Sequence, residues 1–194
     1  MPRFCYNLPD KFLLLHHITM DAGDYEYIQI VLGGRCKASA TNGSVAGVMS
    51  QTLAAKDVLK PVTTIYIKAK EAAKAFKRSK NKPLLFELYS TDKGKLFDGS
   101  GEEVKFSWKP GNLEEPSIDI DTIFPNPDSE NKKPKQFFQL PFYVMRDLVK
   151  VLEGLKVQHF NMLFCEDGDP SVSHYTSYCE GSGEVQASFV TVVE

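Results

Sequence analysis

The sequence predicts an α+β fold assembled from repeated units, in each of which a strand and a helix are followed by three further strands (β-α-β-β-β). Residues 65–110 show this order most clearly, and residues 136–193 show it again. Residues 4–53 fit the same template more loosely. Because self-similarity along a chain is typical of architectures in which like units stack on one another, we expect three copies of one supersecondary unit.

The middle unit has the most regular pattern. Residues 62–67 are rich in β-branched and aromatic side chains, which favour a strand. The helix predicted over 69–78 has apolar residues at i, i+3, i+4 and i+7, so one of its faces can lie on a sheet. This stripe consists of Ala69, Ala72, Ala73 and Phe76. Strands are predicted next over 84–89, 95–97 and 104–108, separated by turns that contain Asp and Gly.

The last unit repeats the order of the middle one. A short strand over 137–140 precedes Pro141, a residue that the first turn of a helix tolerates. The helix is expected to end at Gly154, and its apolar stripe consists of Val144, Met145, Leu148, Val149 and Leu152. Strands are predicted over 157–165, 173–178 and 185–192.

The first unit begins with a strand over 4–7 and a candidate helix over 9–20, whose run of four apolar residues has no clean helical period. Strands over 25–32, 35–41 and 45–52 follow, with Gly33-Gly34 and Asn42-Gly43 as hairpin turns. The proline-rich stretch between units two and three predicts an extended linker. The expected organisation is a domain of two units (1–112), a linker (113–134) and a third unit (135–194).

Composition narrows the class of protein. The chain has 194 residues, of which 42% are hydrophobic and 25% charged, as in soluble globular proteins. No apolar run approaches the ~20 residues of a membrane span, and Pro9, Asp10 and Lys11 interrupt the region in which a secretion signal would be apolar. We therefore expect a cytoplasmic protein with no membrane partner. The four cysteines and four histidines lack ligand spacing, so neither a metal site nor a cofactor is expected.

Positive charge is concentrated in one segment. Residues 56–82 contain nine basic and two acidic residues, a local balance of +7, which leaves −9 for the rest of a chain whose net charge is −2. Such a split predicts one surface for a polyanion. On the middle helix the basic side chains share the side opposite the apolar stripe, and they are Lys70, Lys74, Lys77 and Arg78. The plain alternative is a solvated, lysine-rich helix.

Four short segments, in order along the chain, resemble the DNA sliding clamp family, in particular the bacterial DNA polymerase III beta subunit. Residues 40–46 resemble its A-T-D-G-x-x-L-A strand and turn, and residues 66–72 resemble the strand that enters the second helix of a clamp domain. Residues 123–127 resemble the F-P-D-Y link between domains, and residues 140–152 the first helix of the next domain. The resemblance implies helices on one face of curved antiparallel sheets.

The resemblance also implies a function, that of a non-catalytic protein that binds duplex DNA and supports polymerase processivity in replication. In clamps, helices meet DNA phosphates without reading bases, a task that long lysine side chains suit. The DNA-binding residues expected on this basis are Lys68, Lys70, Lys74, Lys77, Arg78, Arg146 and Lys150. Val45 and Pro125 are the expected partner-binding residues, although Asn42 replaces the motif's Asp and Ser44-Val45 its Arg-Leu.

Three units correspond to about one and a half clamp domains. Either copies of the chain complete one another in a homo-oligomer, or the protein is a compact clamp-like form that does not encircle DNA. A reduced clamp of this kind would suit a phage or another mobile element. DNA polymerase and other replication proteins are the expected protein partners.

Two other functions are compatible with the sequence. The first is a protein-interaction module that binds a polymerase or a host clamp without contacting DNA. The second is an enzyme, with Asp119, Asp121 and Asp128 as metal ligands, or with Glu102-Glu103 or Glu166-Asp167-Asp169 as carboxylate clusters. None of these clusters has the spacing of a catalytic motif, and the chain has no P-loop or H-E-x-x-H, so no enzymatic activity is expected. Trp108 is interpreted as a core anchor, with an interface role as the alternative.

Overall fold

A computed structural model describes residues 4–19, 25–33, 35–43, 45–52, 63–90, 92–108, 142–156, 161–163, 171–179 and 183–191. The predicted linker 113–134 and the predicted strand 137–140 lie outside these ranges, and the predicted domain boundaries stay a prediction. The elements are β1 (Phe4–Leu8), the 3-10 helix η1 (Asp10–Ile18), β2 (Tyr27–Leu32), β3 (Arg35–Thr41), β4 (Val45–Thr52), β5 (Thr63–Lys68), α1 (Ala69–Ser79), β6 (Leu84–Ser90), β7 (Lys93–Phe97), α3 (Phe142–Leu155), β8 (Asn161–Leu163), β9 (Ser171–Cys179) and β10 (Gly183–Thr191).

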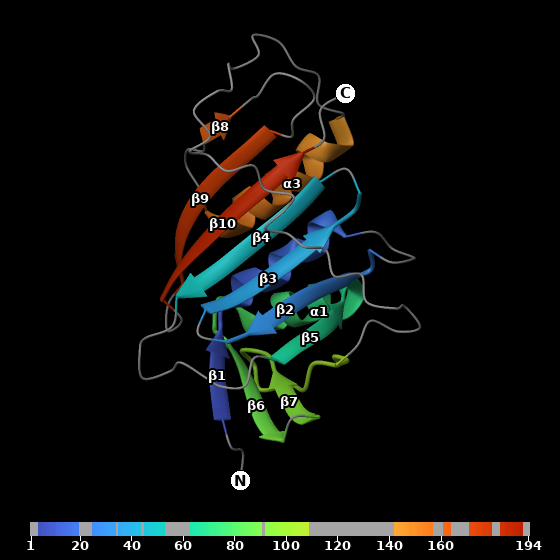
Figure 1. The fold of residues 1–194 in the computed structure, drawn as a ribbon, viewed down its shortest axis with the longest axis vertical. Coiled ribbons are helices and arrows are strands. Elements are labelled where there is room, and N and C mark those ends of the chain that lie inside the picture. Colours follow the sequence, from blue (N-terminus) through green and yellow to red (C-terminus); the bar gives the residue numbers. More distant parts are fainter. Residues whose placement is uncertain are drawn as a thin grey trace.

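The strands form two antiparallel sheets, which confirms the α+β class. The larger sheet has seven strands in the order β5-β2-β3-β4-β10-β9-β8, and the smaller has three in the order β1-β6-β7. The first and third units share the larger sheet, because β10 pairs with β4 from Val185 opposite Gln51 to Thr191 opposite Val45. The helices lie behind this sheet in Figure 1, so one of its faces is covered as predicted.

The segment predicted as a helix over 9–20 is helical, but as a 3-10 helix over Asp10–Ile18. Its four consecutive apolar residues, Phe12 to Leu15, are all buried. They are buried all round because η1 contacts β3 and β4 on one side and both α1 and α3 on the others. A helix enclosed in this way needs no amphipathic period, which explains why the sequence showed none.

Helix α1 buries a slightly different face from the predicted one. Ala72, Ala75 and Ser79 are buried, whereas Ala69 and Ala73 are half-buried. The contact face is rotated because α1 packs against η1 as well as against the sheet. The helix ends where Lys80 turns into the left-handed region at a φ of 50°.

Helix α3 differs from its prediction at two points. Its buried side chains include Val151 and Leu155, while the predicted core residue Val149 is 40% exposed. The helix also continues through Gly154 and ends at Leu155. Gly154 is needed for close packing instead, since a Cβ at this position would lie 2.3 Å from Cδ2 of Leu14 on η1.

Residues 104–108 were predicted to be a strand, and this prediction is wrong. The chain there makes isolated bridges to each sheet in turn, from Glu103 to Phe97 of β7 and from Ser107 to Tyr66 of β5. Because the segment crosses from the smaller sheet to the edge of the larger one, it cannot run beside either as a regular strand. No helix in the described part of the chain is long and apolar enough to cross a membrane.

Candidate nucleic-acid interface

The exposed side of α1 carries the predicted basic row. Lys70, Lys74 and Lys77 are all exposed, on the side away from the buried alanines. Lys74 forms an ion pair with Glu71, with 3.0 Å between Nζ and Oε1. Lys70 and Lys77 form no ion pair with any residue that the structure describes, so these two ammonium groups carry the uncompensated charge of the row.

Lys68 stands at the start of α1 and is held by groups of β2 and the turn before it. Its Nζ lies 2.8 Å from Oε1 of Glu26 and 5.3 Å from the ring centroid of Tyr27. The hydrogen bond from Lys68 lowers the pKa of Glu26. Lys68 is therefore at the predicted surface, but its charge is shared with a carboxylate.

Arg78 has a structural partner that the sequence did not suggest. Its Nε donates a 2.5 Å hydrogen bond to Oδ2 of Asp98, whose side chain is fully buried. Burial alone would raise the pKa of Asp98, but hydrogen bonds from Ser100, from Arg78 and from the backbone outweigh it and lower the pKa. The guanidinium thus neutralises a buried carboxylate and is less available to a phosphate than the lysines are.

The two predicted cations of α3 share one carboxylate. Arg146 and Lys150 are both exposed, and Asp147 lies 3.0 Å from Nε of the first and 3.4 Å from Nζ of the second. This helix therefore contributes less net positive charge than α1.

The structure brings the two basic helices together around η1, which contacts both. Between them lie His16 and His17, whose ring centroids are 3.9 Å apart with the ring planes tilted by 37°. Lys77 of α1 and Lys150 of α3 both act electrostatically on His16. Sequence analysis missed these histidines as part of the surface, because only the packing of three helices places them between the two lysines.

Both histidines are biased toward the neutral form. Burial is the main cause of the lowered pKa of His16, and Lys77 and Lys150 add to it, while the 2.6 Å hydrogen bond to the carbonyl of Leu13 opposes it. Burial, His16 and Lys150 lower the pKa of His17 to about 4. Cationic neighbours disfavour protonation of an imidazole, and a bound anion would reverse that effect.

Of the two predicted partner-binding residues, Val45 is buried at the start of β4. Its backbone N–H donates to Oδ1 of Asn42 at 2.8 Å and its carbonyl accepts from Oγ1 of Thr41 at 2.8 Å, so Val45 closes the turn around Gly43, where φ is 86°. Pro125 lies outside the described residues. The role of both in partner binding stays a prediction.

The carboxylate clusters considered for catalysis are not assembled into a site within the described residues. Two of the clusters lie outside them, namely Asp119, Asp121 and Asp128, and Glu166, Asp167 and Asp169. Glu102 and Glu103 are exposed beside the turn that Asp98 organises. The described part of the chain contains no group of three or more His, Cys, Asp or Glu side chains placed to hold a metal ion.

No protein-family model and no curated protein matches the chain. Solved structures do. A DNA polymerase sliding clamp from Pseudomonas aeruginosa, solved with a ligand, superposes with a TM-score of 0.64 at 9% identity, over 100% of this chain and 66% of the clamp. A second structure of the sliding clamp from that organism gives a TM-score of 0.63 at 9% identity, over 100% of this chain and 67% of the clamp.

The DNA polymerase III subunit beta from the same organism gives a TM-score of 0.63 at 11% identity, again over 100% and 67% of the two chains. The present chain thus spans about two thirds of the length of these clamps. The superposition agrees with the antiparallel sheets and with the helices gathered on one face. We conclude that the chain has the fold of the bacterial DNA polymerase sliding clamps.

Proposed function

We propose that this chain is a non-catalytic, clamp-type accessory protein of DNA replication, which binds duplex DNA by phosphate contacts and without sequence preference. The observation that carries the proposal is the position of Lys70 and Lys77. Both are exposed on α1, on the helix-covered side of a sliding-clamp fold, and neither is paired with a carboxylate among the described residues. Unpaired lysines on a helix face are suited to phosphates, because a flexible point charge does not demand one register on the duplex.

The salt dependence of DNA binding tests the proposal. Each lysine that contacts a phosphate releases counterions, so the slope of log K against log salt grows by about one for each contact. We expect a steep slope for the unmodified protein and a slope shallower by about two for the Lys70→Ala/Lys77→Ala variant. Affinities for duplexes of unrelated sequence should be equal within a factor of about two.

The control is a matched double charge reversal. Lys93 and Lys95 are exposed on β7, in the smaller sheet. Lys70→Glu/Lys77→Glu and Lys93→Glu/Lys95→Glu carry the same net charge, so long-range attraction to DNA is reduced equally in both. Loss of binding in the α1 variant alone supports a local contact. Equal effects in both variants, or a flat salt dependence, would refute the proposed DNA interface.

A second function is favoured by a specific observation, the pairing of most other cations on this side of the fold. Lys68, Lys74 and Arg78 each contact a carboxylate, and Arg146 and Lys150 share Asp147. A surface whose charges are largely balanced also suits a protein partner. On this alternative the chain binds a polymerase or another clamp, and a pull-down with such a partner should persist after nuclease treatment.

We further propose that the chain works as a homo-oligomer, in which copies complete one another's clamp-like units, and the support is the fold that it shares with the sliding clamps. Light scattering with and without a short duplex measures this directly. A closed dimer or larger ring supports encirclement of DNA, whereas a monomer that ignores the duplex supports the protein-interaction alternative.

A further inference from the structure

Among the described residues, α3 is the last helix of a row, and the side opposite its buried residues carries apolar side chains. η1 packs against both α1 and α3, so α3 has a helical neighbour on one side (Figure 1). On the opposite side Phe142 is 84% exposed and Val149 is 40% exposed. These two residues and the half-buried Met145 recur at i, i+3 and i+7, so they form one stripe along the helix. An exposed apolar stripe of this kind indicates a surface that another molecule covers.

Two opposite charges lie along one edge of this stripe. Arg146 comes four residues after Phe142, and it is exposed. Glu153 comes four residues after Val149 and is also exposed, so the two charges hold equivalent positions beside the apolar residues. Glu153 forms no ion pair with any residue that the structure describes. Arg146 contacts Asp147 through Nε, and its guanidinium has further N–H groups for a second carboxylate. The outer face of α3 thus consists of Phe142, Met145, Arg146, Val149 and Glu153.

The charges of the outer face of α3 are self-complementary. Arg146 precedes Val149 by three residues and Glu153 follows it by four, so the two charges lie about 5 Å along the axis on either side of Val149. Two copies of α3 that run in opposite directions and meet near Val149 therefore place Arg146 of each copy opposite Glu153 of the other. In a parallel pair these two residues would lie on opposite edges of the contact. A two-fold dimer requires a surface that matches itself in this way.

We propose that the outer face of α3 is a contact between two copies of this chain, which pack as an antiparallel helix pair about a two-fold axis near Val149. This inference rests on the homo-oligomer proposed above and assigns its contact to the third unit. The Val149 side chains of the two copies meet near the axis, and each Phe142 covers the end of the other helix. Two ion pairs between Arg146 and Glu153 set the direction of the helices, as flanking charges do in other helix pairs.

A second copy fits the outer face of α3 better than DNA or a different protein does. Phosphates require cations, whereas the middle of this face is apolar. A different protein would have to present both charges in the matching order, which a second copy does by symmetry. The contact includes no residue of α1, so Lys70 and Lys77 remain exposed in the dimer for the proposed DNA interface.

A charge exchange in the full-length protein, without DNA, tests the contact and its direction. Light scattering between about 1 and 100 µM measures the mass, since a single pair of short helices buries little area and binds weakly. We expect a dimer that forms as the concentration rises. Arg146→Glu and Glu153→Arg should each weaken dimerisation at least about tenfold, because like charges then meet twice in every dimer. An equimolar mixture of the two variants should dimerise again, since every pair across that contact has opposite charges.

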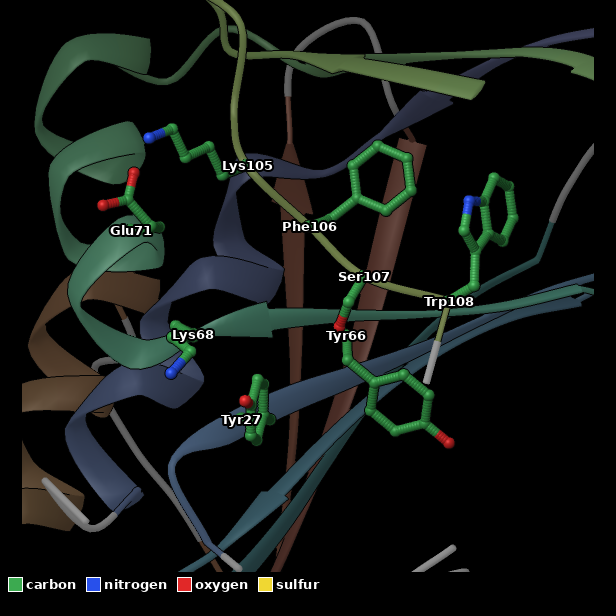
Figure 2. Close-up of a pocket in the computed structure, with 8 residues that line it drawn as sticks. All are labelled: Tyr27, Tyr66, Lys68, Glu71, Lys105, Phe106, Ser107 and Trp108. Carbon is green, nitrogen blue, oxygen red and sulfur yellow. The ribbon is translucent and has the colours of Figure 1, made fainter. Parts of the chain in front are cut away.

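The apolar part of the contact is tested by Val149→Glu, which should also leave a monomer. Tyr25→Glu is its matched control, because Tyr25 is exposed outside α3. Lys105→Glu is the matched control for Arg146→Glu, since Lys105 is exposed beside the start of α1, in the lining of another pocket (Figure 2). Both controls should keep the mass of the unmodified protein. Retained far-ultraviolet circular dichroism confirms that each variant is folded.

Three results would overturn the inference. If the unmodified protein is an oligomer whose mass none of these substitutions changes, another surface joins the copies and the proposed homo-oligomer stands. If the unmodified protein dimerises but the mixture of Arg146→Glu and Glu153→Arg does not, the antiparallel pairing is wrong. A monomer at every concentration, with and without duplex DNA, refutes the homo-oligomer together with this contact. None of these results bears on duplex binding by Lys70 and Lys77, which their own variants test.

Discussion

The ammonium group of Lys11 donates a 2.7 Å hydrogen bond to the backbone carbonyl of Gly154, 143 residues further along the chain. The same nitrogen donates to Oδ1 of Asn81, just past the end of α1, at 3.1 Å. One buried lysine of η1 thus satisfies acceptors at the carboxyl ends of both neighbouring helices, where a cation is favoured by the helix dipole. The three helical segments that present the proposed DNA interface are tied together at this point.

Lys11→Met should lower the free energy of unfolding by about 1–3 kcal/mol, because the carbonyl of Gly154 and the amide of Asn81 lose a buried charged donor while the methylenes of the side chain are kept. Urea denaturation monitored by circular dichroism measures the difference. Lys150→Met on the exposed side of α3 is the control, with an expected change within about 0.5 kcal/mol. An equal effect of the two substitutions would contradict the linking role of Lys11.

Gly154→Ala should also be destabilising, although alanine ordinarily favours a helix. The added Cβ would lie 2.3 Å from Cδ2 and 2.9 Å from Cδ1 of Leu14, so η1 and α3 would have to move apart. Overpacking of this kind costs about 1–3 kcal/mol. The double variant Gly154→Ala/Leu14→Ala should be less unstable than the sum of the two single variants, which a double-mutant cycle measures.

The pair formed by Arg78 and Asp98 should make stability depend on acid pH. The pKa of Asp98 is lower in the folded chain than its ordinary value of 3.8. The ionised carboxylate of Asp98 therefore contributes fully to the free energy of unfolding above pH 3.8. This contribution is lost as pH falls through the lower pKa of the folded state. Asp98→Asn should cost about 1–2 kcal/mol at neutral pH, a figure reduced because Arg78 is 39% exposed to solvent.

The measurement is the free energy of unfolding of the unmodified protein and of Asp98→Asn between about pH 2 and 7. The difference in free energy of unfolding between the unmodified protein and Asp98→Asn should become smaller below pH 3.8. A difference that stays constant across this range would mean that packing, and not the carboxylate charge, accounts for the loss.

Because the pKa values of His16 and His17 are lowered in the folded chain, this pair should make the folded state less stable as pH falls. The folded state lowers the pKa of His17 from 6.5 to about 4, so the unfolded chain binds more protons between these values. Stability should therefore fall as pH falls from 6.5 toward 4. The free energy of unfolding of His17→Gln should fall less over the same pH range. An equal fall in the unmodified protein and in His17→Gln would contradict the assignment of this pH dependence to His17.

The same residues predict a pH effect on the proposed DNA binding. Phosphates that approach Lys77 and Lys150 would favour protonation of His16 and His17, because they neutralise the cations that now disfavour it. DNA affinity should rise as pH falls below 6.5 toward 4, with net proton uptake measured by calorimetry in buffers of different ionisation enthalpy. His16→Gln/His17→Gln should bind DNA without this uptake.

Local sequence patterns were enough for most strands and for the exposed lysines. The runs over 35–41 and 45–52 became β3 and β4 with the predicted bounds, because alternation and turn residues act within a few positions of one another. Lys70, Lys74 and Lys77 are exposed as predicted, since helical geometry alone places them opposite Ala72.

Other features were decided by tertiary structure. The sequence could not show that η1 would pack between the larger sheet and both α-helices, that Arg78 would neutralise a buried Asp98, or that 104–108 would bridge two sheets. Each depends on residues that are distant in the chain, as does the pairing of β10 with β4. Sequence by itself thus determined most of the elements and the charged face of α1, through short-range periodicity. Only packing decided which faces meet, because burial and long-range hydrogen bonds depend on the whole fold.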